Sequence, residues 1–336
     1  MLSLSKNAAL EIARNNNINL NDYEITGQSL LTRDAEGSWK FAHKSIFEFL
    51  IARETIGNPR FWVRQNFDGM DMTEQFILEK YPGFYYLEDF VFIKGGTFLM
   101  GSPENEVDRT SDETQHKVKV SDFYMAKFPV TKEQFEVFKR SQNQKIDTDK
   151  DFSSTFLSDK EKQGQQYPAV RVSWNDATAF CNWLSKRLNA TFRLPTEAEW
   201  EYACRAGTTT PFNTGENLTT DQANYDGNYP YNNNPKGKDV GKTSPVGSYP
   251  PYAWGLFDMH GNVWEWCLDW FGEKYYDECI KHGVEENPKG PKTGSYRVLR
   301  GDSWVNDARN CRSAYRSDGG PDRRDGYGGF RVVFVP

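Results

Sequence analysis

The chain carries near its carboxyl end, at residues 297–331, the stretch RVLRGDSWVNDARNCRSAYRSDGGPDRRDGYGGFR. Both ends of this stretch alternate apolar and polar residues as half-buried strands do, first at Tyr296–Arg300 and again at Gly329–Phe334. Between them, Asn, Asp, Ser, Gly and Tyr crowd together, and few apolar residues could anchor a core. We therefore predict a polar, tyrosine-containing loop that two framework strands hold at the surface, as in a binding site.

Composition and charge limit the class of protein. At 336 residues the chain has room for one large domain and a smaller one. Its 10 Trp, 17 Tyr and 23 Phe residues, beside 27 Gly and 16 Pro, favour a loop-rich fold packed on aromatic rings over a helical bundle. The net charge of -6 leaves no broad basic field, so we expect no nucleic-acid partner.

The sequence also bears on compartment. No apolar run approaches the roughly 18 residues of a spanning helix, so no membrane insertion is expected. The amino terminus lacks the continuous apolar core of a signal peptide, which favours a cytoplasmic location; a removed export signal would place the protein at the cell surface instead. Five cysteines form no CxxC pair, so neither a disulfide framework nor a structural zinc site is indicated.

Residues 1–88 predict a helical extension. Apolar residues recur at helical spacing in Leu4–Ile12 and Phe41–Arg53, and Leu30–Arg33 with Ser38–Phe41 fits a hairpin between them. This order resembles the winged-helix end of signalling NTPases of the NACHT type. The chain has no Gly-Lys-Ser/Thr phosphate loop, so nucleotide hydrolysis is not implied. A helical cap stapled by aromatic residues is the simpler alternative.

Residues 89–336 predict a second domain, in which the pattern of apolar residues and turn formers differs from that of residues 1–88. Alternation and Gly turns in Phe92–Gly101 predict a strand pair, and Lys117–Phe128 predicts a further strand. Residues 205–260 are nearly all turn formers. Because this is too long for an ordinary connection, we expect an ordered loop region that is functional or tied by an ion.

Three helices are predicted in the same domain. Thr131 with Gln134, and Thr196 with Glu199, have the spacing of capping boxes, in which each side chain satisfies a free backbone donor at the start of a helix. Trp174–Leu188 places its apolar residues on one helical stripe.

Seven short motifs follow one another through this domain. They are Gly95–Gly101, Pro129–Thr131, Val172–Ala177, Arg193–Ala203, Gly255–Trp266, Arg300–Trp304 and Gly329–Arg331. In this order they resemble the formylglycine-generating enzyme (sulfatase-modifying factor) family. The resemblance covers about residues 90–336. It implies an α+β fold, namely that family's C-type lectin fold, loop-rich with little regular secondary structure.

The same resemblance bears on catalysis. Enzymes of the family activate oxygen at copper held by two cysteine thiolates, one of them just after the Gly-x-Ser-aromatic turn, and two soft sulfur ligands suit Cu(I). Here Val305 and Asn306 follow that turn. Cys311 instead matches a family position that pairs with the one matched by Cys204. We therefore expect no enzyme and no catalytic residue; an oxygen-dependent formylglycine-generating or related oxidase is the alternative.

The carboxyl-terminal segment is more similar to the variable proteins of diversity-generating retroelements, which share this fold. In those proteins adenine-directed mutagenesis changes Asn codons, and residues 301–316 are close to what an all-Asn template would encode. The resemblance implies a non-enzymatic protein whose variable region, about residues 297–334, binds a macromolecular ligand, expected to be a protein. A solvated, glycine-rich loop is one alternative, and an inert module whose amino-terminal segment interacts is another.

The resemblance also assigns roles within the variable region. The diversified, ligand-binding positions would be Asp302, Val305, Asn306, Asp307, Asn310, Tyr315, Ser317, Asp318, Gly319, Gly320, Arg323, Asp325, Gly326 and Tyr327. The scaffold would include Trp304, Ala308, Cys311, Arg312, Ser313, Arg316, Pro321 and Phe330. Tyr315 and Tyr327 favour binding, because large amphipathic side chains among small polar ones are typical of binding surfaces.

No cofactor is required by this interpretation, and calcium is the one candidate ion. The family positions that ligate calcium through two side-chain and two backbone oxygens are matched by Asp258, Gly261, Val263 and Glu265. Hard oxygen donors suit that ion. The alternative is that Trp264–Trp266 simply packs and Glu265 caps a turn. The acidic residues of 104–113 are expected to form a solvated loop.

Overall fold

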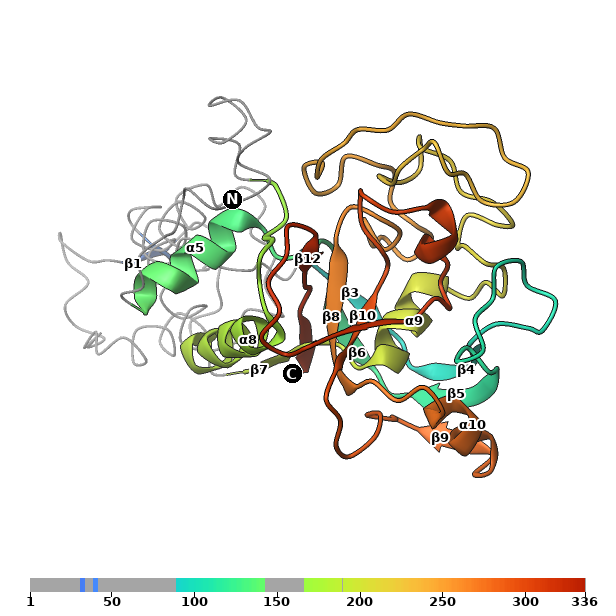
Figure 1. Ribbon diagram of the computed structural model, residues 1–336. Helices are drawn as coiled ribbons and strands as arrows, with labels where there is room; N and C mark the ends of the chain where they lie inside the picture. The colour runs from blue at the N-terminus through green and yellow to red at the C-terminus, as the bar shows by residue number, and fades with distance from the viewer. Residues whose placement is uncertain (1–30, 34–38, 42–88, 143–165, 189, 336) are drawn as a thin grey trace. The chain divides into compact units, whose positions relative to one another are not determined.

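The computed structural model describes residues 31–33, 39–41, 89–142, 166–188 and 190–335 (Figure 1). Its contacts divide the chain into one unit of Met1–Leu87, Lys186–Ala190 and Pro336, and another of Glu88–Ser185 and Thr191–Val335. In the first unit, β1 (Leu31–Arg33) pairs antiparallel with β2 (Trp39–Phe41), which confirms the predicted hairpin. The helix predicted at Leu4–Ile12, and that predicted at Phe41–Arg53 beyond its first residue, lie outside the described residues.

Three sheets are formed by the described residues of the larger unit. The first contains, in order, β11 (Ser317–Gly319), β10 (Arg297–Arg300), β8 (Trp264–Trp270) and β12 (Gly328–Gly329). The second contains, in order, β3 (Phe90–Ile93), β6 (Phe123–Ala126), β13 (Val333–Val335) and β7 (Thr191–Arg193). The third contains, in order, β4 (Gly96–Met100), β5 (His116–Val120) and β9 (Val284–Glu286). Framework strands therefore precede and follow the polar segment, as predicted.

Two strand predictions were wrong at one corner of the chain. β3 and β4 do not pair with each other but belong to different sheets, and Lys117–Phe128 forms two strands, β5 and β6. At this corner the Gly95 N–H donates to the Asp122 carboxylate at 2.7 Å. A Cβ at Gly95 would lie 2.4 Å from the Val120 carbonyl oxygen. The two turns therefore pack on each other and send the chain from one sheet to the next.

The three predicted helices are confirmed. In the part of the chain that the structure describes, the helical segments are α5 (Lys132–Ser141), α8 (Trp174–Leu188), α9 (Glu197–Arg205), α10 (Tyr275–Ile280) and the short 3-10 turn η2 (Ala308–Cys311). Before α9, the Thr196 hydroxyl accepts from the Glu199 N–H, and the Glu199 carboxylate accepts from the Thr196 N–H. Thr131 and Gln134 make the same reciprocal pair before α5. Both capping boxes thus start helices.

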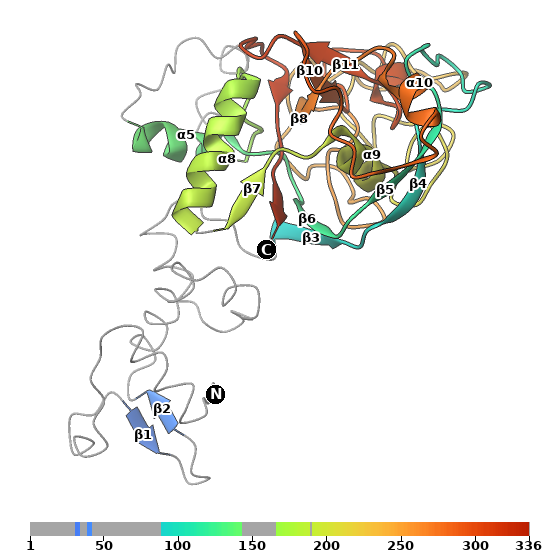
Figure 2. The ribbon, with the colours of Figure 1, turned by 90° about the horizontal axis from the view of Figure 1, so that it is seen from below.

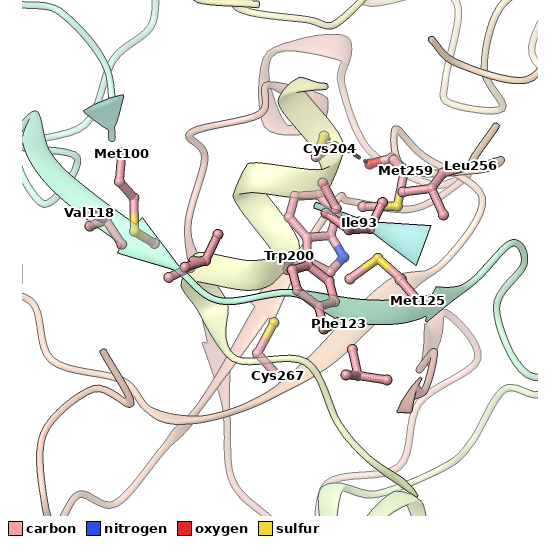
Figure 3. Packing of buried hydrophobic residues seen from close by; sticks show 14 of the residues in the cluster. Ile93, Met100, Val118, Phe123, Met125, Trp200, Cys204, Leu256, Met259 and Cys267 are labelled. Carbon is pink, nitrogen blue, oxygen red and sulfur yellow. Dashed lines mark hydrogen bonds between the residues drawn. The ribbon is translucent and has the colours of Figure 1, made fainter. Parts of the chain in front are cut away.

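The core forms around α9, which packs against β4, β5, β8 and β10 (Figure 2). Figure 3 shows Trp200 of this helix among Ile93, Phe123 and Met125. All four side chains are buried, and burial of large apolar side chains contributes about 1.5–3 kcal/mol each. This central helix connects the sheets to the segment that follows β10.

The long loop region is ordered, as predicted. Between α9 and β8 the described chain forms neither helix nor strand. It nevertheless buries Phe212, Leu218, Tyr225 and Tyr231 in a small core that also contains Ala308 and Cys311 of η2. The loop region therefore supports the polar carboxyl-terminal segment from one side (Figure 1). Among the described residues, no helix has both the length and the apolar character needed to span a bilayer.

Candidate functional site

Buried arginines tie residues 302–327, the displayed segment, to the rest of the domain. Arg312 donates at 2.7 Å to each carboxylate oxygen of Glu113 and at 2.6 Å to Glu106. Arg316 donates to both oxygens of Glu197, at 2.7 and 2.9 Å. Both arginine side chains have 0% exposure. The sequence offered few apolar residues that could anchor this segment in a core, and the structure shows that it buries paired cations in their place.

The partners of Arg312 correct an expectation. The acidic residues of 104–113 do not form a merely solvated loop, since the side chains of Glu106 and Glu113 are buried. Burial alone would raise the pKa of Glu113, but its hydrogen bonds with Arg312 hold that pKa below the ordinary value. Such a pair contributes to stability only while both members are present.

Two more buried arginines hold the framework strands. Arg300 of β10 donates at 2.6 Å to Glu201 of α9 and at 2.6 Å to the Ser313 carbonyl. Arg331 donates to both oxygens of Glu265, each at 2.6 Å. The displayed segment therefore leaves and rejoins the domain at positions fixed by charge-assisted hydrogen bonds, which are stronger than neutral ones.

Most of the predicted ligand-binding positions reach solvent. Val305 and Arg323 are exposed, and those of intermediate exposure are Asn306, Asp307, Asn310, Tyr315, Ser317, Asp318, Gly320, Asp325 and Tyr327. Arg323 donates to the Tyr327 hydroxyl at 3.1 Å and pairs with Asp325 at 2.8 Å. These three side chains form one polar group on the segment's second half.

Trp264 of β8 contacts both predicted tyrosines. Its ring centroid lies 6.1 Å from that of Tyr315, and its backbone N–H donates at 2.8 Å to the Tyr327 backbone carbonyl. Sequence reasoning did not assign Trp264 to the site. The signal was present in the Trp264–Trp266 repeat, whose alternation on a strand points its two tryptophans to the same face.

Three predicted ligand-binding positions are buried, so the prediction that they are displayed at the surface was wrong. They are Asp302, Gly319 and Gly326. The Asp302 carboxylate accepts from Asn306 Nδ2 at 2.6 Å and from the Cys311 thiol at 3.6 Å. Burial raises the pKa of Asp302 to about 8. A Cβ at Gly319 would lie 2.7 Å from the Trp266 ring.

The thiols are protonated and buried. All five cysteines are free. Burial raises the pKa of Cys204 to about 12 and raises that of Cys311 well above its ordinary value. His260 lies 3.9 Å from the Cys204 sulfur, but burial lowers its pKa to about 4, so it stays neutral. A reactive thiol needs a stabilised thiolate, and these cysteines have none.

The candidate calcium residues do not fit the ion. Both oxygens of Glu265 accept hydrogen bonds from Arg331, and one also accepts from Trp200 Nε1 at 2.7 Å. Since Arg331 neutralises this carboxylate, Glu265 is not a free ligand. Burial raises the pKa of Asp258 to about 6, and the Gly261 carbonyl accepts from the Val263 N–H at 2.9 Å. In the described ranges no three His, Cys, Asp or Glu side chains are grouped to hold a metal.

Comparison with known sequences identifies the family. Residues 79–335 match the sulfatase-modifying factor enzyme 1-like domain. The mouse formylglycine-generating enzyme is 32% identical over 294 residues, covering 74% of this chain and 75% of that one. The serine/threonine-protein kinase pkn1 of Chlamydia caviae is 34% identical over 258 residues, covering 73% of this chain but 38% of the kinase, so the chain spans well under half of that protein. The mouse inactive C-alpha-formylglycine-generating enzyme 2 is 28% identical and covers 72% of this chain. The family thus includes members named as enzymes and one named as inactive.

Solved structures share the fold. PvdO from Pseudomonas aeruginosa superimposes with a TM-score of 0.61 at 30% identity, covering 74% of this chain and 94% of that one. Treponema denticola variable protein 1 superimposes with a TM-score of 0.59 at 25% identity, covering 74% of this chain and 95% of that one. With the match over residues 79–335, these similarities show that the chain belongs to the sulfatase-modifying factor enzyme 1-like family and has its loop-rich, C-type lectin-like fold.

Proposed function

We propose that this protein is a non-enzymatic ligand-binding protein, the variable protein of a diversity-generating retroelement, and that its displayed segment binds a macromolecular ligand, a protein. One observation carries the proposal. Within a few residues, Arg312 and Arg316 are buried in ion pairs, whereas Tyr315, Ser317 and Asp318 reach solvent. Anchoring and display are thus assigned to different side chains.

This division explains how the segment could be altered without loss of the fold. The side chains that hold it are the paired arginines and the buried Ala308 and Cys311. Surface substitutions away from such anchors usually change stability by about 0.5 kcal/mol or less. Exchange of the exposed residues therefore changes the ligand and leaves the frame in place. The similarity to Treponema denticola variable protein 1 supports the same interpretation.

A protein ligand fits this surface better than a nucleic acid. Tyr315 and Tyr327 offer large amphipathic contact area among small polar neighbours, as binding loops of antibodies do. Arg323 is engaged by Asp325, and the net charge of -6 gives no field that would attract phosphates.

The surrounding DNA provides the direct test. A variable protein predicts a nearby near-copy of the segment encoding residues 297–334 that differs from it only where the copy has adenine. Differences spread over all four bases, or no such copy, would count against the retroelement. A second test combines substitutions at Val305, Tyr315 and Arg323, which should leave the unfolding temperature within a few degrees of the wild type.

An oxidase is the second candidate, and the 32% identity to the mouse formylglycine-generating enzyme favours it. It requires thiolates that hold copper, whereas the thiols described above are buried and protonated. Titration with Cu(I) under a competing chelator, followed by oxygen consumption with a cysteine-containing peptide, separates the two functions. Tight, stoichiometric copper uptake with oxygen consumption would establish the oxidase; we expect neither.

A further inference from the structure

The last part of the displayed segment, residues 320–327, is held by the first turn of α8. Within the segment the buried arginines are Arg312 and Arg316, and the loop that follows them is attached by other contacts. Figure 2 shows the carboxyl-terminal segment, in red, passing one end of α8. Residues 320–327 are called the clamped loop below.

Asp176 joins the clamped loop to α8 through an ion pair. Its two carboxylate oxygens accept from Arg324 at 2.7 and 2.9 Å. The same carboxylate caps the helix, because one of its oxygens also accepts from the Ser173 N–H at 3.0 Å. Burial alone would raise the pKa of Asp176, but the hydrogen bonds with Arg324 and Ser173 hold that pKa below its ordinary value. Asp176 is therefore a fixed, charged acceptor for the loop.

Two further residues attach the clamped loop to the same part of the domain. Asn175 Nδ2 donates to the Asp322 carboxylate at 2.6 Å, and the Asn175 N–H donates to the Pro321 carbonyl at 3.2 Å. The Arg171 N–H donates to the Asp325 carbonyl at 2.8 Å. The loop is thus attached at residues 321, 322, 324 and 325.

The side chains that reach α8 are not the predicted ligand-binding ones. Asp322 and Arg324 both lie outside the set of diversified positions, whereas Asp325 is attached through its backbone carbonyl. Exposure does not make this distinction, since the side chains of Arg323 and Arg324 are 44% and 51% exposed. Their partners do, because Arg323 pairs with Asp325 inside the loop and Arg324 pairs with Asp176 outside it.

We propose that Asn175 and Asp176 are positioning residues of the binding site, which hold the clamped loop in one shape whichever side chains stand at positions 323, 325 and 327. The inference rests on the proposed function and adds to it two residues outside the variable region. A loop that is fixed before binding loses less conformational entropy on contact with a protein ligand, as in matured antibody loops. The exposed side chains can then be exchanged while the loop stays pre-formed.

Hydrogen exchange followed by mass spectrometry tests this in the full chain. The reporter is the peptide of residues 168–176, which contains the Arg171 and Asn175 amides and has the same sequence in every variant. Arg324→Ala should make its exchange about 3-fold faster or more, because the ion pair is lost while the helix cap stays. Arg324→Lys keeps the charge without the two-fold hydrogen bond and should be intermediate. The matched control, Arg309→Ala, removes an exposed arginine that pairs with Asp307 in the same segment, and should change the exchange less than about 1.5-fold.

A second comparison exchanges the ligand-binding side chains. The triple variant Arg323→Ala, Asp325→Ala and Tyr327→Ala should leave the exchange of the reporter peptide unchanged while Arg324 is present. Added to Arg324→Ala, the triple substitution should speed that exchange further, because the contacts inside the loop are then the ones that hold its shape. This coupling separates positioning of the loop from a general effect on folding.

Three outcomes would overturn the inference. Faster exchange in the triple variant alone would show that the diversified side chains set the shape of the loop, and unchanged exchange in Arg324→Ala would show that Asp176 does not hold it. An unfolding temperature that falls in step with the faster exchange would show an effect on overall stability instead. None of these results bears on whether the displayed segment binds a ligand, which the search for a DNA near-copy tests separately.

Discussion

Arg312 and Glu113 form a two-fold hydrogen-bonded ion pair, with both N–O distances at 2.7 Å and neither side chain exposed. The arginine belongs to the displayed segment and the glutamate to the loop before β5. This pair fixes the segment to a part of the chain 199 residues away. Stability of the fold should therefore depend on it more than on any exposed contact of the segment.

Replacing Arg312 with methionine should lower the free energy of unfolding by about 3–5 kcal/mol, because it leaves the Glu113 carboxylate buried without a cation. The measurement is urea denaturation at pH 7. Arg323→Met is the matched control, since its ion pair is exposed, and it should cost less than about 1 kcal/mol. Adding Glu113→Gln to Arg312→Met should recover part of the loss; equal losses in the two single arginine variants would contradict the anchoring role.

The loss of folding stability at acid pH should also depend on the pair of Arg312 and Glu113. The pKa of Glu113 is held below its ordinary value of 4.5. The contribution of this carboxylate is therefore present above pH 4.5 and is lost as the pH falls through its folded-state pKa. In Arg312→Met, burial of Glu113 is no longer opposed and its pKa should rise, so the stability deficit of this variant relative to the wild type should shrink as the pH falls, which urea denaturation at several pH values measures.

The fold could be predicted from the sequence where local chemistry decides structure. Two capping boxes started helices at Lys132 and Glu197, and the alternation at Arg297–Arg300 formed a strand. The corner at Gly95 could not be predicted, because a turn there is compatible with either pairing of its strands. Only the approach of Val120 decides it.

The site could be predicted in part for a related reason. Polarity and tyrosine content indicated which segment is displayed, but they did not separate buried arginines from exposed ones; only the family resemblance placed Arg312 in the scaffold and Arg323 among the ligand-binding positions. Arg312 and Arg323 look alike in sequence, and the difference lies in Glu113, far along the chain. Asp302 was misassigned in the same way, since its burial depends on Cys311 and Asn306 closing over it.

Asp302→Asn should stabilise the protein at alkaline pH. Burial raises the pKa of this carboxyl to about 8, against an ordinary value of 3.8. The folded state therefore binds a proton that the unfolded state releases, and stability due to this group falls as the pH rises from about 4 to 8. The advantage of the variant should widen over that range, by about 1.4 kcal/mol for each unit between the two pKa values or on the order of 5 kcal/mol in all, and then level off.

Thermal unfolding between pH 4.5 and 8.5 measures this difference, at about 2–4 °C per kcal/mol for a domain of this size. Asp307→Asn is the control, because that side chain is 31% exposed and lies in the same loop. A constant offset between wild type and Asp302→Asn across the range would show that the buried carboxyl does not titrate as described.

Adjacent glycines should respond differently to alanine. A Cβ at Gly319 would lie 2.7 Å from the Trp266 ring and 3.3 Å from Leu299, whereas at Gly320 nothing lies within 4 Å. Overpacking of a buried site costs about 1–3 kcal/mol, so Gly319→Ala should be destabilised by that amount and Gly320→Ala by less than about 0.5 kcal/mol. Urea denaturation of the two variants measures this difference in stability. Equal tolerance at both positions would return Gly319 to the set of freely variable residues.

The paired tyrosines on Trp264 should dominate ligand affinity. Tyr315 and Tyr327 approach the same tryptophan, one through its ring and one through its backbone. Central tyrosine contacts of this kind contribute about 1–4 kcal/mol each, so alanine at either position should weaken binding by roughly 5-fold or more. The ligand would first be captured on the immobilised wild-type protein, identified and purified, and affinity then measured by biolayer interferometry.

The double variant gives the sharper result, because both residues contact Trp264, Tyr315 through its ring and Tyr327 through its backbone carbonyl, and we expect their effects not to add. Residues in contact with a shared partner usually show coupling of about 0.5–3 kcal/mol. Tyr315→Ala with Tyr327→Ala should therefore lose less, or more, than the sum of the single losses, whereas Tyr315→Ala with Tyr296→Ala, which removes an exposed tyrosine outside residues 302–327, should be additive. Unchanged affinity in the Tyr315 and Tyr327 double variant would show that the displayed segment is not the binding site.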